Sequence, residues 1–209
     1  MARYVFFSFD YEDVKNFKVN VVRNSWLINN SQSVFIDGSI WESEKSKGAD
    51  VIKDLIADGL SQTSVTAVLI GENTYSRRWV KYEIVKSFEK GNGLFAVHIN
   101  RIKGRTGLTA RGLNPFDKLG FEISNDGKKI SFFELINRHW YGYADLPMIN
   151  NKKTNSLHFT DHWWSGNEFG KFFRFSEKFP TYCWDFDEGH PNFSGWTEIA
   201  VKEFSKFRN

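Results

Sequence analysis

The chain has 209 residues, of which 41% are hydrophobic, 25% charged and 17% aromatic, so it can form a globular core in one domain, or in one domain with an appendage. The net charge of +3 comes from scattered basic residues and argues against a nucleic-acid partner. A single cysteine excludes an internal disulfide. No segment resembles a signal peptide or reaches the ~18 apolar residues of a membrane helix. We therefore expect a cytoplasmic protein without a membrane contact.

Strand-like and helix-like patterns alternate along the first half of the chain. Short apolar runs at residues 4–9, 34–37, 64–70 and 94–99 are typical of strands that are buried on both faces. Helical spacing follows each of the first three runs. The first helix begins after Asp10, which is its N-cap, and carries Val14, Phe17 and Val21 on one face. The second helix spans residues 48–60. The third spans residues 77–90 and has Ser76 as its N-cap. This order predicts an α/β fold with a flavodoxin-like parallel sheet and helices on both faces.

Ligands of such sheets bind beyond the carboxyl ends of the strands. The loops that deserve inspection are therefore residues 8–13, 37–44 and 71–78.

The second half has weaker patterns. Residues 121–123 and 130–133 flank an Asp-Gly pair that is typical of a hairpin turn. The tail is too aromatic for a disordered segment, and it ends in a helix from about residue 192 whose buried face should contain Trp196, Ile199, Ala200 and Phe207. We expect one domain over residues 1–145 and an aromatic-rich extension over residues 146–209 that packs on it.

The segment from Ser76 to Lys86 carries the most chemistry. Trp79 and Glu83 are four residues apart, so on a helix they lie one turn from each other, near the ligand end of the sheet. An indole can stack on a flat heteroaromatic ring, and a carboxylate can stabilise positive charge at a sugar carbon during glycosidic cleavage. The alternative is that Trp79 belongs to the core and Glu83 is a surface residue paired with Lys86 or Lys90.

These motifs resemble the TIR domains. The resemblance rests on FFSFDYED after the first strand, VFIDGSIWE after the second, and SVTAVLIGENTYSRRWVKYEIVKSFEKG, which contains Ser-x-x-Trp-x-x-x-Glu. It implies a TIR-like fold in which the loop after the second strand is the mobile BB loop, a gate at about residues 39–45. In TIR enzymes that cleave NAD⁺ the matching glutamate is catalytic, which implies that role for Glu83, with Trp79 as its partner.

The chain is similar to one branch in particular, the TIR-like B proteins (ThsB) of bacterial Thoeris anti-phage systems. That similarity also covers KVNVVRNSW, NPFDKLGFEISNDGKKI and, more loosely, YCWDFDEGHPNFSGW. It implies an enzyme that responds to a phage-derived trigger, cleaves NAD⁺ at the nicotinamide–ribose bond and makes a cyclic ADP-ribose isomer. That nucleotide would activate an effector NADase, ThsA.

Further substrate contacts follow from the resemblance. It implies that Ser8, Phe9 and Asp10 border the NAD⁺ site, and that Asp37, Ser39 and Trp41 begin the BB loop. Each has an ordinary explanation as a turn or cap residue. Basic residues that some TIR enzymes carry after the first strand are replaced here by acidic ones, so contacts to the diphosphate would come from Arg77, Arg78 or a second, self-associated subunit.

Other functions remain open or are disfavoured. A non-enzymatic TIR-like adaptor that assembles with itself is the main alternative, and a receiver-like nucleotide binder is a weaker one. The chain lacks G-x-G-x-x-G and GK[ST] motifs, His158 and His162 lack a zinc motif, and a calcium-like loop from Asp185 has Trp196 at its twelfth position. We therefore expect NAD⁺ to be the substrate, with neither a cofactor nor a metal.

Overall fold

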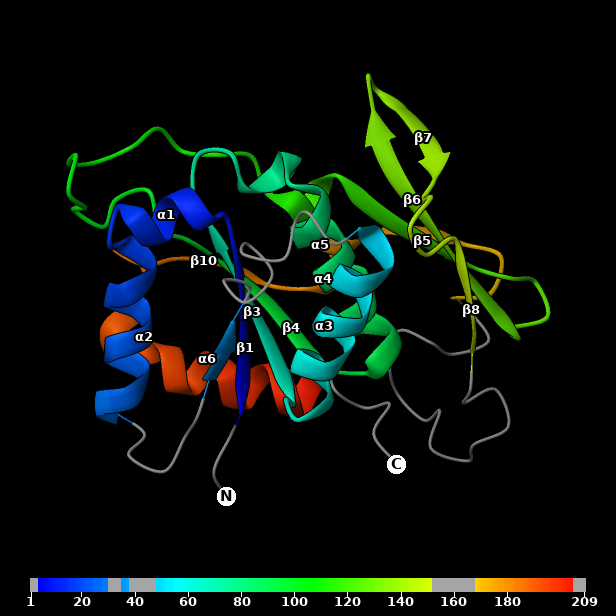
Figure 1. The fold of residues 1–209 in the computed structure, drawn as a ribbon. Helices are drawn as coiled ribbons and strands as arrows, with labels where there is room; N and C mark the ends of the chain where they lie inside the picture. The colour runs from blue at the N-terminus through cyan, green and yellow to red at the C-terminus, as the bar shows by residue number, and fades with distance from the viewer. Residues whose placement is uncertain (1–3, 30–34, 38–47, 152–167, 205–209) are drawn as a thin grey trace.

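The computed structural model describes residues 4–29, 35–37, 48–151 and 168–204 (Figure 1). Its central feature is a five-stranded parallel sheet in the order β10-β4-β3-β1-β2. The strands are β1 (Val5–Phe9), β2 (Phe35–Asp37), β3 (Val65–Ile70), β4 (Gly93–His98) and β10 (Thr181–Cys183). The predicted α/β fold is confirmed, and the four predicted strands agree with the observed ones within a residue at each end.

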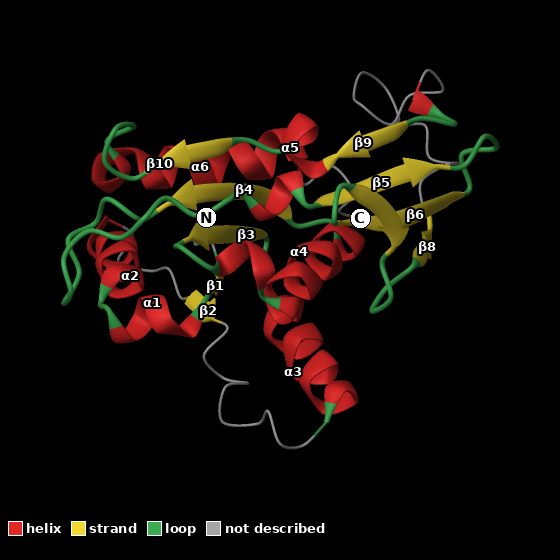
Figure 2. Cartoon of the chain, turned by 90° about the horizontal axis from the view of Figure 1, so that it is seen from above, coloured by secondary structure: helices red, strands yellow, loops and turns green. Residues whose placement is uncertain are grey.

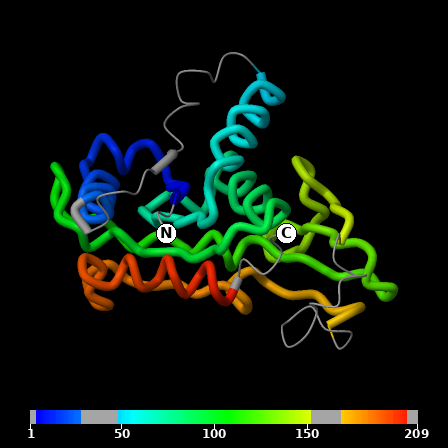
Figure 3. Tube along the Cα trace, turned by 90° about the horizontal axis from the view of Figure 1, so that it is seen from below, coloured from blue at the N-terminus to red at the C-terminus, as the bar shows by residue number. Residues whose placement is uncertain are grey.

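Helices cover both faces of this sheet, which explains why its strands are almost continuously apolar. On one face lie α3 (Ala49–Ser61) and α4 (Arg78–Lys90), and on the other lie α2 (Lys18–Asn29) and α6 (Gly189–Phe204). Figure 3 shows α6 and α3 on opposite sides of the sheet. Every residue of β1, β3 and β4 is buried between these layers.

The first predicted helix is interrupted. The chain forms α1 (Tyr11–Lys15) and then α2, and Phe17 between them has a φ of 61°, in the left-handed region. Phe17 is 53% exposed and Val21 39%, so the burial predicted for these two residues is wrong, whereas Val14 packs against the core. The buried face of α2 consists of Val19, Val22 and Trp26. The turn at Phe17 changes which side of the helix faces the sheet.

The helix that carries Glu83 was predicted almost correctly. Its N-cap is Arg77, however, and not Ser76, which lies in the short 3₁₀ helix η2 (Thr74–Ser76) and donates to the carbonyl oxygen of Asn73 at 2.8 Å. Gly91, with a φ of 86°, ends the helix in the left-handed conformation that glycine adopts without strain. Val80, Ile84 and Phe88 are buried against the sheet side as expected.

A second, antiparallel sheet packs beside α4 and has the order β7-β6-β5-β9 (Figure 2). Its strands are β5 (Leu119–Ile123), β6 (Lys129–Ile136), β7 (His139–Gly142) and β9 (Phe172–Arg174), and β8 (Met148–Asn150) also pairs with β6. The predicted hairpin is confirmed as β5 and β6, with Gly127 at a φ of 68° in the turn. Two short helices, η3 (Pro115–Asp117) and α5 (Phe175–Lys178), join the sheets.

The C-terminal segment supplies elements to both sheets. Strand β9 pairs with β5, strand β10 pairs with β4, and α6 packs over β4. Helix α6 begins at Gly189, and its buried stripe contains Phe193, Trp196 and Ala200. Ile199 is 46% exposed, so its predicted burial is wrong, because the buried stripe runs through Phe193, Trp196 and Ala200 and Ile199 lies beside it. Phe207 lies outside the described residues. Among the described helices, none has the length and apolarity needed to cross a bilayer.

Candidate active site

The carboxyl ends of β1, β3 and β4 meet at one edge of the parallel sheet. Two of the loops singled out from the sequence, residues 8–13 and 71–78, lie together at this edge and are joined by an ion pair between Arg77 and Asp10, with an N···O distance of 2.8 Å. Asp10 is also the N-cap of α1, as predicted, and accepts a hydrogen bond from the amide of Glu12 at 3.4 Å.

Glu83 lies inside the protein at this edge. Its residue is 1% exposed, and its carboxylate accepts a hydrogen bond from the hydroxyl of Ser8, a fully buried residue near the end of β1. The interpretation of Glu83 as a surface residue paired with Lys86 or Lys90 is wrong. Lys86 pairs with Glu89, and Lys90 donates to the carbonyl oxygen of Thr63 and to Asn92. Burial also means that a ligand reaches this carboxylate only after neighbouring groups move.

Trp79 occupies an intermediate position. It is half-buried at the margin of the core around α3 and α4, with its ring at 89° to that of Tyr82 and 6.1 Å from it. The guanidinium of Arg78 lies 4.6 Å from the indole centroid. Part of the indole therefore packs and part remains accessible.

The other expected contacts divide into three groups. Phe9 is a core residue, and the guanidinium of Arg23 lies over its ring, 4.9 Å from the ring centroid. The backbone of Asp37 ends β2 opposite Phe7 of β1, which places it at the same edge of the sheet. Ser39, Trp41 and the expected gate at residues 39–45 lie outside the described residues.

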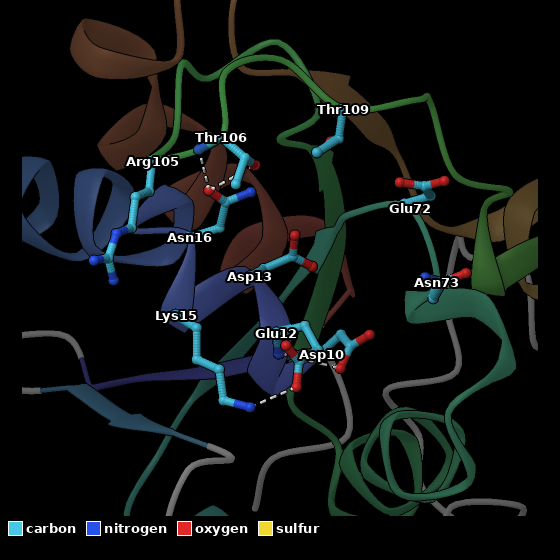
Figure 4. Close-up of a pocket in the computed structure, with 10 residues that line it drawn as sticks. All are labelled: Asp10, Glu12, Asp13, Lys15, Asn16, Glu72, Asn73, Arg105, Thr106 and Thr109. Atoms are coloured by element: carbon cyan, nitrogen blue, oxygen red, sulfur yellow. Dashed lines mark hydrogen bonds and ion pairs between the residues drawn. The ribbon is translucent and has the colours of Figure 1, made fainter.

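A pocket of about 310 Å³ opens beside Asp10 at the strand ends (Figure 4). We call it the acidic pocket; its lining is polar and rich in carboxylates, and comprises Asp10, Glu12, Asp13, Lys15, Asn16, Glu72, Asn73, Arg105, Thr106 and Thr109. Of the expected substrate contacts that the structure describes, Asp10 alone lines it. Glu83, Ser8, Phe9 and Trp79 lie outside its lining.

Asp13 is the unusual member of the acidic pocket. It is 7% exposed, and its carboxylate has no hydrogen-bond or ion-pair partner among the described residues. Burial, reinforced by the negative charge of Asp10, raises the pKa of Asp13 to about 6, although the charges of Lys18 and Arg77 oppose this rise. Gly71 leaves room for this carboxylate, since a Cβ there would collide with it.

A buried lysine, Lys18, holds one of the residues that line the pocket, Thr109. The ammonium of Lys18, at the start of α2, donates to the carbonyl oxygens of Asn100 and Ile102 at 2.9 and 2.8 Å, and to the hydroxyl of Thr109 at 3.2 Å. These bonds hold the loop that follows β4 against α2. Burial lowers the pKa of Lys18, and the negative charge of Asp13 opposes that effect.

Comparison with known proteins gives the family. Residues 6–103 match the sequence profile of the Thoeris protein ThsB, TIR-like domain, and they span the first four strands of the sheet together with Ser8, Asp13, Trp79 and Glu83. A relative from Bacillus cereus (strain MSX-D12) is 43% identical over 201 residues, which cover 94% of this chain and 99% of the relative. Its name is "Putative cyclic ADP-D-ribose synthase ThsB1". The chain belongs to the ThsB family.

The ThsB resemblance noted in the sequence is therefore confirmed, but sequence reasoning missed most of the acidic pocket. In the sequence, Asp13 stood out only as the last residue of the loop at residues 8–13, and the loop containing Arg105, Thr106 and Thr109 carried no motif. The available signal was position, because all of these residues follow the carboxyl ends of strands.

The basic residues expected to contact phosphate in this ThsB protein are partly engaged. Arg77 holds Asp10, while Arg78 makes a bidentate pair with Asp145, at 2.9 and 2.7 Å. Among the described residues, no group of three or more His, Cys, Asp or Glu side chains could hold a metal ion. His158 and His162 are not described, and the segment once considered as a calcium loop is helical from Gly189.

Proposed function

We propose that this protein is an anti-phage enzyme that cleaves NAD⁺ at the nicotinamide–ribose bond and forms a cyclic ADP-ribose isomer, with Glu83 as its catalytic carboxylate. One observation carries the residue assignment: the Glu83 carboxylate lies at the carboxyl edge of a parallel sheet, held by Ser8. The name of the 43% identical relative supports the reaction.

The chemistry required of Glu83 is electrostatic. As the glycosidic bond breaks, both bonding electrons move to the ring nitrogen, nicotinamide leaves as a neutral molecule, and positive charge develops on the ribose. A carboxylate in a site of low dielectric constant stabilises that charge more strongly than one in water. Since Glu83 is 1% exposed, binding must include a rearrangement that brings the ribose next to it.

The fate of the ribosyl cation decides the product. If water is excluded, a hydroxyl or ring nitrogen of the same molecule attacks the anomeric carbon and closes a cycle, whereas water gives linear ADP-ribose.

The remaining contacts and partners belong to the same proposal. We assign Trp79, Ser8, Phe9, Asp10, Asp37, Ser39 and Trp41 to the surroundings of the substrate, on the strength of the TIR resemblance and, for the described ones, their place at one sheet edge. The nucleotide would activate the effector ThsA in the cytoplasm after a phage-derived trigger. NAD⁺ is the substrate in this scheme, which uses neither a cofactor nor a metal; self-association could complete the site.

The test is Glu83→Gln, which keeps the size of the side chain and a hydrogen-bond acceptor for Ser8 but removes the charge. We expect the loss of one catalytic electrostatic contact to lower NAD⁺ cleavage by about 10²-fold or more. The measurements are nicotinamide release and mass spectrometry of nucleotides in phage-infected cells that express this protein alone.

The matched control is Glu89→Gln, on the same helix and paired with Lys86, which should retain activity. Cleavage by Glu83→Gln at the wild-type rate, in a variant that melts at the wild-type temperature, would exclude the assignment.

The adaptor alternative is favoured by one observation, which is the nearly complete burial of Glu83 with a hydrogen-bond partner. An adaptor uses such a contact only to stabilise its fold. In that case infected cells would show no nicotinamide release even with the wild-type protein, and Glu83→Gln would lower stability alone.

A further inference from the structure

The acidic pocket contains a buried carboxylate that no described group hydrogen-bonds. Asp13 is 93% buried and faces the pocket, yet no described group donates a hydrogen bond to it. A buried carboxylate without a hydrogen-bond donor destabilises the fold, and a ligand that brings a donor into the pocket would offset that cost.

We propose that the acidic pocket binds the adenosine end of NAD⁺, with Asp13 accepting hydrogen bonds from the ribose hydroxyls or the adenine amino group. This inference rests on the proposed function. The role of Glu83 concerns only the nicotinamide riboside end of NAD⁺, and the inference adds a binding site for the other end.

The chemistry of the lining selects this part of the substrate. Asp10, Glu12, Asp13 and Glu72 present hydrogen-bond acceptors, so the occupant must supply donors. A ribose diol and an exocyclic amine are donors, whereas phosphate oxygens are acceptors and would be repelled from the interior. A volume of about 310 Å³ lies at the lower end of the range for small-molecule sites and suits a nucleoside.

The position of the pocket suits the proposed reaction. Asp10 lines the pocket and is bound by Arg77, the N-cap of the helix that carries Glu83, while Ser8, two residues before Asp10, is bonded to Glu83 itself. The acidic pocket and the Glu83 carboxylate therefore lie next to each other at the end of β1. Arg77, which is bound to Asp10 and begins the helix of Glu83, can meet the diphosphate that links the two nucleosides.

Cyclisation needs such an arrangement, whereas hydrolysis does not. The bond between the anomeric carbon and the nicotinamide nitrogen breaks, and its electrons neutralise the pyridinium. The new bond forms from an oxygen or nitrogen of the adenosine end; when a hydroxyl attacks, its proton passes to solvent or to a carboxylate. Holding the adenosine end beside Glu83 raises the effective concentration of that nucleophile over water.

Direct binding is the first test, with ADP-ribose and nicotinamide mononucleotide as probes of purified protein. We expect Asp13→Asn to weaken ADP-ribose binding about tenfold and to leave nicotinamide mononucleotide binding unchanged, because only ADP-ribose contains adenosine. The control is Glu89→Gln, which changes a carboxylate outside the pocket lining that pairs with Lys86 and should leave the binding of both probes unchanged. No binding of ADP-ribose to the wild-type protein, or equal affinity in Asp13→Asn, would overturn the inference.

Product partition in infected cells is the second test. Asp13→Asn should still release nicotinamide, but the ratio of cyclic to linear ADP-ribose should fall about tenfold or more. An unchanged ratio overturns the inference while leaving the proposed function intact. Nicotinamide release that survives Glu83→Gln removes the proposed function, irrespective of the Asp13 result.

Discussion

At the scale of single residues, Asp13 shows how a binding group can lower stability. Between its unfolded pKa of 3.8 and its folded pKa of about 6, the folded protein holds a proton that the unfolded chain releases. The free energy of unfolding therefore falls as pH rises through this window, by at most about 3 kcal/mol. Above a pH of about 6, the buried negative charge lowers the free energy of unfolding by its full amount.

Asp13→Asn removes this titration, and we expect the variant to be more stable than the wild type at pH 8, by about 1–3 kcal/mol, but nearly equal to it at pH 4. Urea unfolding at both pH values measures the difference. The neighbouring charges of Asp10, Glu72, Lys18 and Arg77 are common to both proteins. A variant that is less stable at pH 8 would show that the carboxylate has a stabilising partner.

Single residues also show what spacing can reveal. The separation of Trp79 and Glu83 predicted that both lie near the ligand edge, because helical geometry is local. It could not reveal that Ser8, 75 residues away in sequence, binds the Glu83 carboxylate, or that this bond would be buried. Contacts of that kind depend on the packing of a helix on a sheet, which one sequence does not specify.

At the scale of elements, strands were easier to predict than the first helix. Continuous apolar runs define buried strands, and β1, β3 and β4 follow them within a residue. The break at Phe17 has no such signal, since Phe is not a residue that favours a positive φ. Its physical reason lies elsewhere, in the turn that directs Lys18 towards the carbonyl groups of the loop after β4.

Lys18→Met tests that explanation, because methionine fills similar space but donates no hydrogen bond. We expect the free energy of unfolding to fall by about 2–4 kcal/mol, since the carbonyl groups of Asn100 and Ile102 lose a charged donor inside the protein. Urea unfolding measures the loss. Lys15→Met, on the exposed side of α1, should change it by less than about 0.5 kcal/mol; equal midpoints for both variants would contradict the role of Lys18.

At the scale of the whole molecule, the sequence indicated an extension over residues 146–209 that packs on the core. It could not indicate that β10 would become a strand of the parallel sheet, because three residues carry no periodic pattern. Phe193 of α6 shows how closely the two parts are joined. Its ring lies 5.8, 5.8 and 5.4 Å from those of Phe7, Trp26 and Phe95.

Phe193→Ala should therefore destabilise the first-half sheet as well as the tail. We expect a loss of about 3–5 kcal/mol, with reduced hydrogen-exchange protection in β1 and β4. Ile199→Ala, on the exposed side of the same helix, is the control. Unchanged protection in β1 and β4 would mean that residues 146–209 fold as a separate unit.

The position of α6 has a consequence for biosynthesis. The ribosome makes this helix after the strands β1, β3 and β4, on which it packs. A nascent chain can form β1, β3 and β4 early, but the part of their sheet that α6 covers stays open until this helix has been made. An enzyme that consumes a coenzyme needed by its own host would thereby remain incomplete while it is still being synthesised.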